Sequence, residues 1–356
     1  MTAEPITAAS KITSRWLTAR LLENGHLIRG KVTAISKTRF TTFFSNIFRL
    51  KLNYSSNAFP NLPSNMVLKS ALPDSADSLN MGKLEVSCYR VFAPAMPDGP
   101  LVRCFDAVHS VRSNRSHILM EDLSPTHFQP EIPIPPSRQL CELSVQSLAQ
   151  FHVFGWRHPG LGSSIGELLD VVGVDEIVRQ LQRGLAGLAD ELGDALSPHR
   201  RAVYDRALNF MATFWARRLT VTHHNTLIHG DAHLWNFLHP RNPILGRAHL
   251  IDLGTCNRIR PPTNDLAYMI ALQWYPERRA LMETGLLQCY HDHLVSLGVN
   301  DYSWDDCQLD YRFSVVSHLF TPVFQWAGKR IPASVWWHNL DRIFQAYDDL
   351  RCSEIL

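Results

Sequence analysis

Alternating apolar and polar residues characterise the first third of the chain. Three short segments have the two-residue period of half-buried strands, and the third of them ends in Lys69. A fourth strand is expected just before residue 120. The expected strands are 32–35, 47–52, 65–69 and 118–119. Between the last two, residues 80–96 have helical spacing, with an apolar stripe formed by Leu84, Cys88, Val91 and Phe92.

The pattern changes to a helical period after residue 136. An extended proline-rich stretch, 130–136, is expected to lead over the surface to a helix at 137–154. Leucines then recur every three or four residues through 161–219, which is typical of core helices rather than of a partner-binding face. We therefore expect an α+β protein with two domains, 1–123 rich in strands and 124–356 mainly helical.

A short β-hairpin is predicted at 237–251, where apolar residues flank a turn-rich insert that contains Pro240, Pro243 and Gly246. The hairpin would bring Asn236 and Asp252 close together, since they stand at the outer ends of its two strands. An amide oxygen and a carboxylate are a suitable pair of ligands for Mg²⁺, which takes its other ligands from water and phosphates. Asp231 lies just before Asn236 on a tight loop, the position expected of a base that orients a hydroxyl.

Each of these features has a simpler explanation when it stands alone. The Asp of an isolated His-Gly-Asp more often caps a helix or turn, and Asp252-Leu253-Gly254 by itself is compatible with a turn after a strand. The combination favours catalysis. His229-Gly230-Asp231, Asn236 and Asp252 follow one another in the order and spacing of kinase-type phosphoryl-transfer enzymes.

On these residues the chain resembles the aminoglycoside phosphotransferase and choline kinase superfamily. The variant His-Gly-Asp-Ala-His-Leu-Trp-Asn at 229–236 is similar to the ecdysteroid-kinase-like branch, and 264–268 matches the family's Asp-Leu-Ala-Tyr helix start. Two C-terminal segments, 302–304 and 310–312, also resemble that branch. The resemblance extends from about Trp16 to Tyr347 and implies a two-lobed protein-kinase-like fold, with an antiparallel sheet in the smaller lobe.

The resemblance also implies roles for individual residues in an enzyme that uses ATP and Mg²⁺. Lys69 would hold the α- and β-phosphates with Glu85 as its partner, although a strand-terminal lysine and a helix glutamate are usually solvated. Asp265 would brace the catalytic loop through backbone hydrogen bonds, with His229 as further structural support. The segment that links the two lobes, where backbone groups hold the adenine, would be Glu121, Asp122 and Leu123.

One segment departs from the family pattern. Kinase-like folds cover the phosphates with a glycine-rich turn, because glycine lets backbone amides approach closely. Residues 36–46 contain no glycine, so that Thr41, Thr42 and Ser45 would supply hydroxyls and amides, and Arg39 charge. This departure motivates one alternative, a catalytically silent kinase-like nucleotide-binding protein. A protein kinase is disfavoured because no Ala-Pro-Glu segment follows Asp252.

Composition excludes several other classes of protein. The formal net charge of +2 gives no case for nucleic-acid binding, and no apolar run approaches the length of a membrane span. The first 14 residues lack the apolar core of a signal peptide. The 7 cysteines are scattered, which fits a reducing cytoplasm. We expect His223 and His224 to point apart on a strand, as surface or structural residues.

The acceptor is expected to be a hydroxyl on a small molecule. A polycationic aminoglycoside would require a concentrated acidic rim, but the acids of the C-terminal region alternate with arginines and lysines. Most of its aromatic residues are expected in the core. These observations favour a largely apolar alcohol or a hydroxyacyl compound. Aminoglycoside and choline-type acceptors remain the alternatives, the latter through an aromatic cage. The oligomeric state is not indicated.

Overall fold

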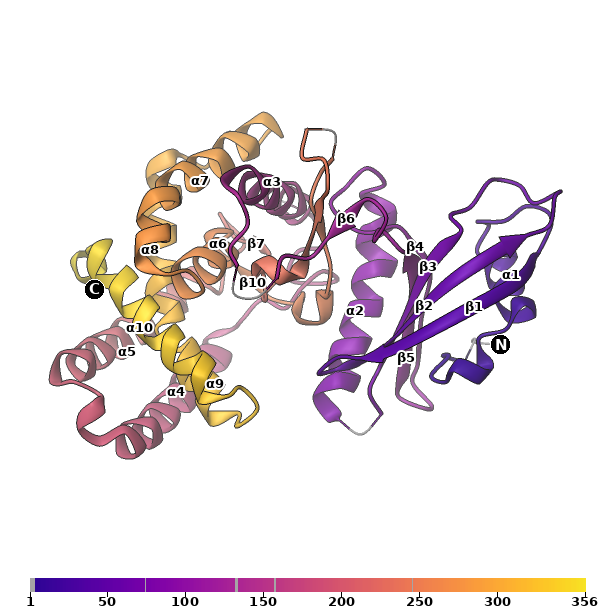
Figure 1. The fold of residues 1–356 in the computed structure, drawn as a ribbon. Coiled ribbons are helices and arrows are strands. Elements are labelled where there is room, and N and C mark those ends of the chain that lie inside the picture. Colours follow the sequence, from indigo (N-terminus) through magenta and orange to yellow (C-terminus); the bar gives the residue numbers. More distant parts are fainter. Residues whose placement is uncertain (1–3, 74, 132–133, 157, 245) are drawn as a thin grey trace. The chain divides into compact units, whose positions relative to one another are not determined.

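The computed structural model describes residues 4–73, 75–131, 134–156, 158–244 and 246–356. The chain divides into two compact units (Figure 1). The first comprises Met1–Pro133 and Asn236–Cys256, and the second comprises Ile134–Trp235 and Asn257–Leu356. The predicted boundary at residue 123 differs from this division. The strand β6 (His127–Phe128) pairs with β8 (Phe237–Pro240), and Leu101 bridges Leu250, so both segments belong to the first unit.

The first unit is built on a five-stranded antiparallel sheet in the order β1-β2-β3-β5-β4. Its strands are β1 (Val32–Thr41), β2 (Ser45–Tyr54), β3 (Asn65–Ala71), β4 (Cys104–Ser110) and β5 (Arg115–Glu121). Its helices are α1 (Ser14–Glu23) and α2 (Ala76–Ala95), with short 3-10 turns at Ala9–Lys11 and Leu253–Thr255. The strands β6, β8 and β9 (His249–Leu250) form a smaller sheet, which contains the predicted hairpin.

The two helices of this unit lie on opposite sides of the large sheet (Figure 1). Phe48, Leu50 and Leu68 are fully buried in the cluster that also contains Leu17 and Leu21 of α1. Because side chains alternate along a strand, Lys69 faces the other side, where α2 packs. That packing is close: a Cβ on Gly82 would lie 2.3 Å from the hydroxyl of Ser116 on β5.

Two predictions for the first unit need correction. The expected loop 36–46 is mostly sheet, because β1 and β2 pair from Lys37–Leu50 to Thr41–Asn46 and only residues 42–44 form the turn. The helix expected at 80–96 begins at Ala76, where Ser75 accepts a hydrogen bond from the amide of Ser78. Its buried face also differs from the predicted stripe, since Val91 is 45% exposed and Glu85 is buried.

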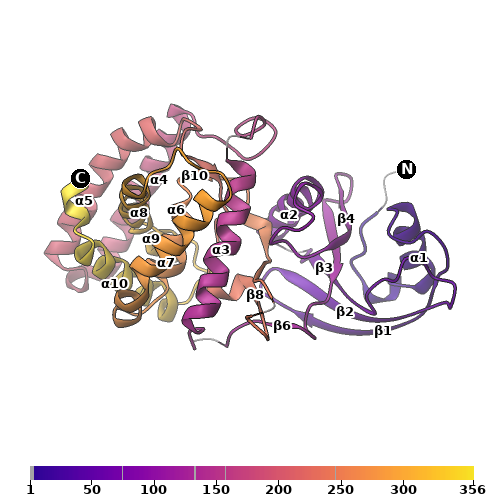
Figure 2. The same ribbon diagram turned by 90° about the horizontal axis from the view of Figure 1, so that it is seen from above.

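The second unit is mainly helical. Its helices are α3 (Arg138–Gly155), α4 (Val171–Leu192), α5 (Pro198–Arg218), α6 (Thr263–Ala267), α7 (Pro276–Ser296), α8 (Trp304–His318), α9 (Thr321–Ala327) and α10 (Ala333–Asp349). Tyr268–Leu272 form a π-helical turn, and Gly193–Ala195, Leu234–Asn236 and Cys352–Ile355 form 3-10 turns. The two strands β7 (Thr226–Leu227) and β10 (Ile259–Arg260) pair antiparallel. The helix α3 packs against α7, and α6 packs against α8 (Figure 2).

The structure confirms the helix expected at 137–154 and corrects two other predictions for this unit. The segment expected to be helical from 161 to 219 contains two helices, α4 and α5, and residues 161–170 are not helical. His223 and His224 lie in a turn rather than on a strand, because His224 adopts a left-handed conformation with φ 52°. The proline-rich stretch 130–136 lies partly outside the described residues.

Among the described residues, no helix is both long and apolar enough to cross a membrane. The seven cysteines are all free.

Candidate active site

Lys69 is held between two carboxylates of the first unit. Its Nζ atom lies 2.8 Å from Oε2 of Glu85 on α2 and 2.8 Å from Oδ1 of Asp252, which follows β9. Burial by itself would lower the pKa of Lys69, but the charges of Asp252 and Glu85 outweigh it and raise the pKa above its usual value. Lys69 is therefore charged at neutral pH.

Glu85 links α2 to the segment that carries Asp252. Its side chain is 4% exposed and accepts the amide N–H of Leu253 in addition to the ammonium of Lys69. Cys88, one turn further along α2, donates to the carbonyl of Cys256 at 3.2 Å. Glu85 therefore positions both Lys69 and the backbone next to Asp252.

The hairpin of β8 and β9 brings Asn236 and Asp252 to the same end of their two strands. Phe237 pairs with Leu250, and the amide of Ile251 donates to the carbonyl of Asn236 at 3.0 Å. Asp252 then leaves the strand in a left-handed conformation, with φ 64° and ψ 57°, and its side chain is 40% exposed. A carboxylate and an amide side chain at one end of a hairpin are a donor set that fits Mg²⁺.

The loop that carries Asp231 belongs to the second unit and is held by Asp265. One carboxylate oxygen of Asp265 accepts the amide of His229 at 2.7 Å, and the other accepts the amide of Gly230 at 2.9 Å. Asp265 and the side chain of His229 are fully buried. Burial would raise the pKa of Asp265, but hydrogen bonds from His152 and from the Gly230 amide outweigh burial and lower it. The carboxylate is therefore ionised.

Sequence reasoning missed two residues that support Asp265. The Nε2 atom of His152 lies 3.0 Å from Oδ2 of Asp265, and its Nδ1 atom lies 2.7 Å from the hydroxyl of Tyr290. Since an ionised carboxylate can only accept, Nε2 carries a proton and donates to Asp265. A histidine among the apolar residues of the helix predicted at 137–154 is the signal that could have singled out His152, but nothing in the sequence indicates its partner.

The Asp231 side chain contacts other side chains of the second unit. His233 Nε2 lies 3.6 Å from its Oδ2 atom, and the Tyr268 hydroxyl forms a hydrogen bond with its carboxylate. Burial, followed by the charge of Asp231, raises the pKa of Tyr268 well above its usual value, so the hydroxyl remains protonated and donates. Tyr268 begins the π-helical turn after α6, and such turns occur frequently at functional sites. The sequence motif contained Tyr268 without indicating this role.

The predicted link between the lobes follows β5. The amide of Glu121 donates to Arg103 and that of Asp122 to Asn65, while Ser124 donates to the side chain of Asp122 at 2.9 Å. In the described part of the chain, the amide of Leu123 has no hydrogen-bonding partner. Among the amides of residues 121–124, that of Leu123 therefore remains available to a ligand.

The side chains of the glycine-free hairpin bond to one another. The amide oxygen of Asn46 accepts from Arg39 at 2.7 Å and from the hydroxyl of Thr41 at 3.1 Å, and the hydroxyl of Thr42 bonds to the backbone of Ser45. These groups were expected to contact phosphates. In the structure they close the β1–β2 hairpin, and their contact with phosphates stays a prediction.

We expect Asp265→Ala to destabilise the second unit by about 3–5 kcal/mol, because two buried amides and His152 would lose their acceptor. The lowered pKa of Asp265 adds a pH dependence. Its contribution to stability is present above the unfolded-state pKa of about 3.9 and is lost as the pH falls below that value.

Denaturant unfolding at pH 7 and at pH 3 measures both effects. The difference in free energy of unfolding between the wild type and Asp265→Ala should be smaller at pH 3 than at pH 7. Asp292→Ala, which removes an exposed carboxylate in the same unit, serves as control. A loss below about 0.5 kcal/mol at pH 7 would show that Asp265 does not brace the loop.

Known phosphotransferases resemble this chain in sequence pattern and in fold. The model of the phosphotransferase enzyme family matches residues 64–302. No curated protein matches the chain by sequence. Among solved structures, choline kinase from Cryptosporidium parvum Iowa II is 9% identical over 90% of this chain and 91% of that one, with a TM-score of 0.58. A putative aminoglycoside phosphotransferase from Ralstonia eutropha JMP134 is 14% identical over 96% and 98% of the two chains, with a TM-score of 0.55.

A macrolide 2'-phosphotransferase from Brachybacterium faecium is 14% identical over 87% of this chain and 92% of that chain, with a TM-score of 0.54. At these identities the solved structures show a shared α+β, protein-kinase-like fold. The family model covers more than half of the 356 residues, including the segment from Lys69 to Asp265. The chain therefore belongs to the phosphotransferase enzyme family and is a small-molecule kinase.

Proposed function

We propose that this kinase transfers the γ-phosphoryl group of Mg²⁺-bound ATP to a hydroxyl of a small molecule. The observation that carries the proposal is Lys69, held at 2.8 Å by both Glu85 and Asp252. A lysine kept charged beside a carboxylate that can bind metal is the arrangement that phosphoryl transfer requires. The nucleotide complexes among similar structures, a GDP complex and an AMP-bound complex, support nucleotide use.

In this proposal the site residues of the first unit divide the binding of the nucleotide and its metal among them. Lys69 binds the phosphates, Glu85 orients Lys69, and Asn236 and Asp252 hold the metal. Bound Mg²⁺ would neutralise charge on the phosphates. The amide of Leu123 would donate to the adenine edge. Its neighbours in sequence, Glu121 and Asp122, would flank the adenine.

In the second unit, Asp231 would accept the proton of the acceptor hydroxyl. The hydroxyl oxygen forms a bond to the γ-phosphorus while the bond to the bridging oxygen of ADP breaks, so that ADP is the leaving group. Asp265 and His229 would hold the loop, and positioning would supply most of the acceleration. Asp231 and Asn236 lie on either side of the point where the chain passes from the second unit to the first.

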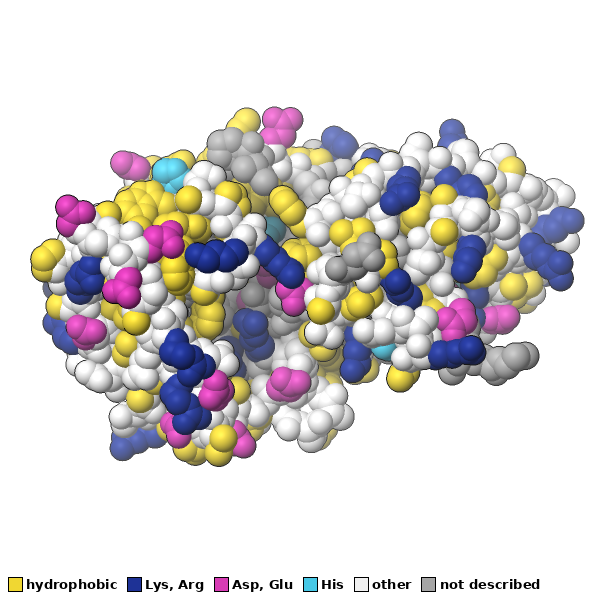
Figure 3. All heavy atoms as spheres, turned by 90° about the horizontal axis from the view of Figure 1, so that it is seen from below, with side chains coloured by type: hydrophobic (Ala, Val, Ile, Leu, Met, Phe, Trp, Pro, Cys, Tyr) yellow, Lys and Arg dark blue, Asp and Glu magenta, His cyan; other side chains and the backbone are white. Residues whose placement is uncertain are grey.

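We propose a largely apolar alcohol or a hydroxyacyl compound as the acceptor, because few acids of the C-terminal region are available to a polycation. Asp310 is paired with Arg218 and Asp341 with Arg200. Asp349 is paired with Arg279, and Asp306 caps α8. Figure 3 shows Asp and Glu side chains interspersed with Lys and Arg on the face it presents. This distribution disfavours an aminoglycoside.

The aromatic residues of the second unit also disfavour a choline cage. Phe313, Phe320 and Phe344 are at most 2% exposed, as core residues are. Two aromatic rings outside that group already face cations of the chain itself: Arg278 lies over Trp274 and Arg342 over Tyr275. The narrower likeness to the ecdysteroid-kinase-like branch and a cytoplasmic location remain predictions.

ADP release from Mg²⁺-ATP tests the proposal. Separate pools of sterols and terpenols, hydroxyacyl thioesters, choline analogues and aminoglycosides would be offered as acceptors. We expect release with one of the first two pools. ADP release with choline analogues or aminoglycosides alone would show that the acceptor belongs to that class rather than to the proposed one. ATP binding without release from any pool would favour the silent nucleotide-binding protein, and failure to bind ATP would refute the proposed function.

A further inference from the structure

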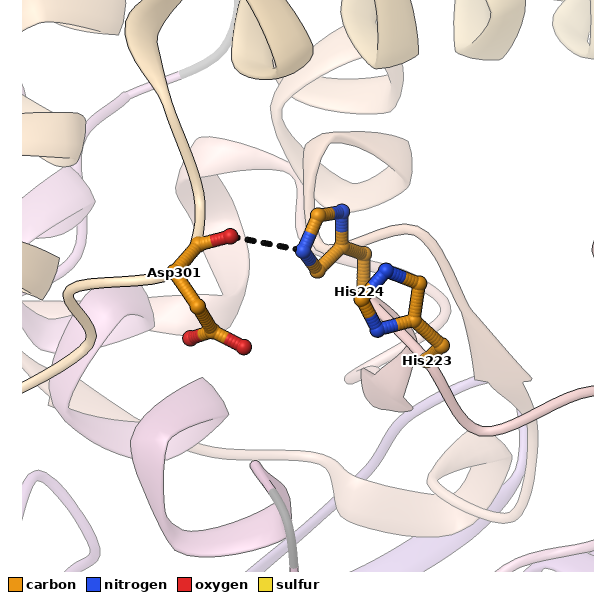
Figure 4. A group of neighbouring side chains, drawn as sticks. All are labelled: His223, His224 and Asp301. Carbon is orange, nitrogen blue, oxygen red and sulfur yellow. Dashed lines mark hydrogen bonds between the residues drawn. The ribbon is translucent and has the colours of Figure 1, made fainter.

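Two histidines and an aspartate of the second unit come together away from the residues proposed for phosphoryl transfer. His223 and His224 lie between α5 and β7, and Asp301 lies between α7 and α8. Each offers a ligand atom, and these atoms all lie within 4.8 Å of one another. Figure 4 shows the two imidazole rings beside the carboxylate of Asp301. We propose that these three residues form a binding site for a divalent transition-metal ion such as Zn²⁺.

The donor set selects this class of ion. Two imidazole nitrogens and one carboxylate oxygen suit Zn²⁺, Cu²⁺ and Ni²⁺, whereas Ca²⁺ and Mg²⁺ prefer oxygen ligands alone. Three protein ligands leave one position of a tetrahedral site for water. The ion is therefore different from the Mg²⁺ of the proposed phosphotransfer, and this inference does not rest on that function.

The backbone holds the histidine pair in place. Arg218 donates to the carbonyls of His223 and His224 at 3.0 and 2.9 Å and is itself fixed by Asp310 at 2.6 Å. The side chain of Asn225 also bonds to Arg218. Such a network fixes the turn before any ligand binds, so that little ordering is needed on binding.

The conformation of His224 brings the rings together. Its φ of 52° turns its side chain back onto His223, and the ring centroids are 3.8 Å apart with the planes inclined by 30°. Tyr302 packs edge-on against His224 at 5.1 Å. On a strand the two side chains would point to opposite sides, so the turn is what creates the site.

The segment of Asp301 is already hydrogen-bonded to the turn that carries His223 and His224. The Nε2 atom of His224 lies 2.8 Å from the backbone carbonyl oxygen of Asp301 (Figure 4), and so donates to it. Metal-bound histidines commonly donate their other ring N–H to a carbonyl. Coordination through Nδ1 would keep this hydrogen bond, and coordination through Nε2 would replace it with a bond to the ion.

The site has room to close on an ion. It borders a cavity of about 450 Å³ lined also by Trp156, His158 and Asn225. His223 and Asp301 are both exposed, so that an ion can reach them from solvent. Zinc–ligand bonds of about 2.0–2.1 Å require ligand atoms roughly 3.4 Å apart, so the three side chains, whose ligand atoms now lie within 4.8 Å of one another, would close around the ion.

Binding would cross-link two segments 77 residues apart in the sequence. One of them leads through β7 directly into the loop of Asp231. Because the assembled site does not exist in the unfolded chain, the ion should stabilise the folded second unit.

Zinc titration of the chelator-treated protein tests the proposal. Calorimetry at pH 7.5 should give one Zn²⁺ per chain in the presence of excess Mg²⁺, with a rise in Tm, and Co²⁺ should give the visible absorption of a tetrahedral site. His223→Ala, His224→Asn and Asp301→Asn should each weaken binding by at least about tenfold. Asn is chosen at position 224 because it tolerates the left-handed conformation.

His199→Ala is the matched control, since His199 is an exposed histidine 3.6 Å from a carboxylate, that of Asp348, and should leave binding unchanged. Circular dichroism and Tm without metal establish that each variant is folded. The proposal is overturned if the wild type binds no Zn²⁺ below millimolar concentrations. It is equally overturned if a variant that combines the three substitutions binds Zn²⁺ as tightly as the wild type, which would place binding at other residues.

Discussion

Asp231→Ala should lower kcat by about a thousandfold while the affinity for Mg²⁺-ATP changes less than about twofold, because a positioned base typically contributes 10²–10⁴-fold. Asp231 is the carboxylate to which Tyr268 donates, on the loop that Asp265 holds by two backbone amides. The groups that Asp265 binds are backbone amides, which the substitution leaves in place. The loss should therefore fall on kcat, the parameter that reports an interaction made only in the transition state.

Single-turnover phosphoryl transfer, together with equilibrium titration of a fluorescent nucleotide, separates the two quantities. Asp292→Ala removes an exposed carboxylate from the same unit and should behave as wild type. An equal loss of nucleotide affinity and kcat would assign Asp231 to nucleotide binding. Unchanged turnover in Asp231→Ala would remove it from the mechanism.

The elements that the sequence predicted well are those with a strong local signal. The hairpin at 237–251 has apolar strands around a proline-rich turn, and β8 and β9 pair as this pattern indicates. Lys69 and Glu85 were linked by their order in the family and lie 2.8 Å apart. Order along the chain was sufficient here because a strand and the helix that follows it pack against each other.

The predictions failed where the structure depends on backbone conformation or on contacts between residues far apart in the sequence. Residues 36–41 are polar except for Phe40, yet they extend β1 because each pairs with a residue of β2. The left-handed turn at His224 has no signature in a His-His dipeptide, so the rings were expected to point apart. His152 contacts Asp265 across 113 residues of sequence, and a single sequence gives no means of pairing them.

Asp252→Asn should abolish the dependence of nucleotide affinity on Mg²⁺ and lower kcat by about a thousandfold, because metal stabilisation of the transferring phosphoryl group is worth several kcal/mol. A neutral amide in place of the carboxylate removes the charge that attracts the ion. The substitution preserves the fold at this position. Asparagine tolerates the φ of 64° found at Asp252, and Lys69 retains its second partner, Glu85, at 2.8 Å.

Nucleotide titrations with and without Mg²⁺ measure this effect directly. In the wild type Mg²⁺ should tighten binding, and in Asp252→Asn the two titrations should coincide. Asp77→Asn, an exposed charge removed from the first turn of α2, is the control in the same unit. If Mg²⁺ still tightened binding to the variant as it does in the wild type, Asp252 would not be a metal ligand. Its contact with Lys69 would then be a structural ion pair, and the metal would have to be held by other residues.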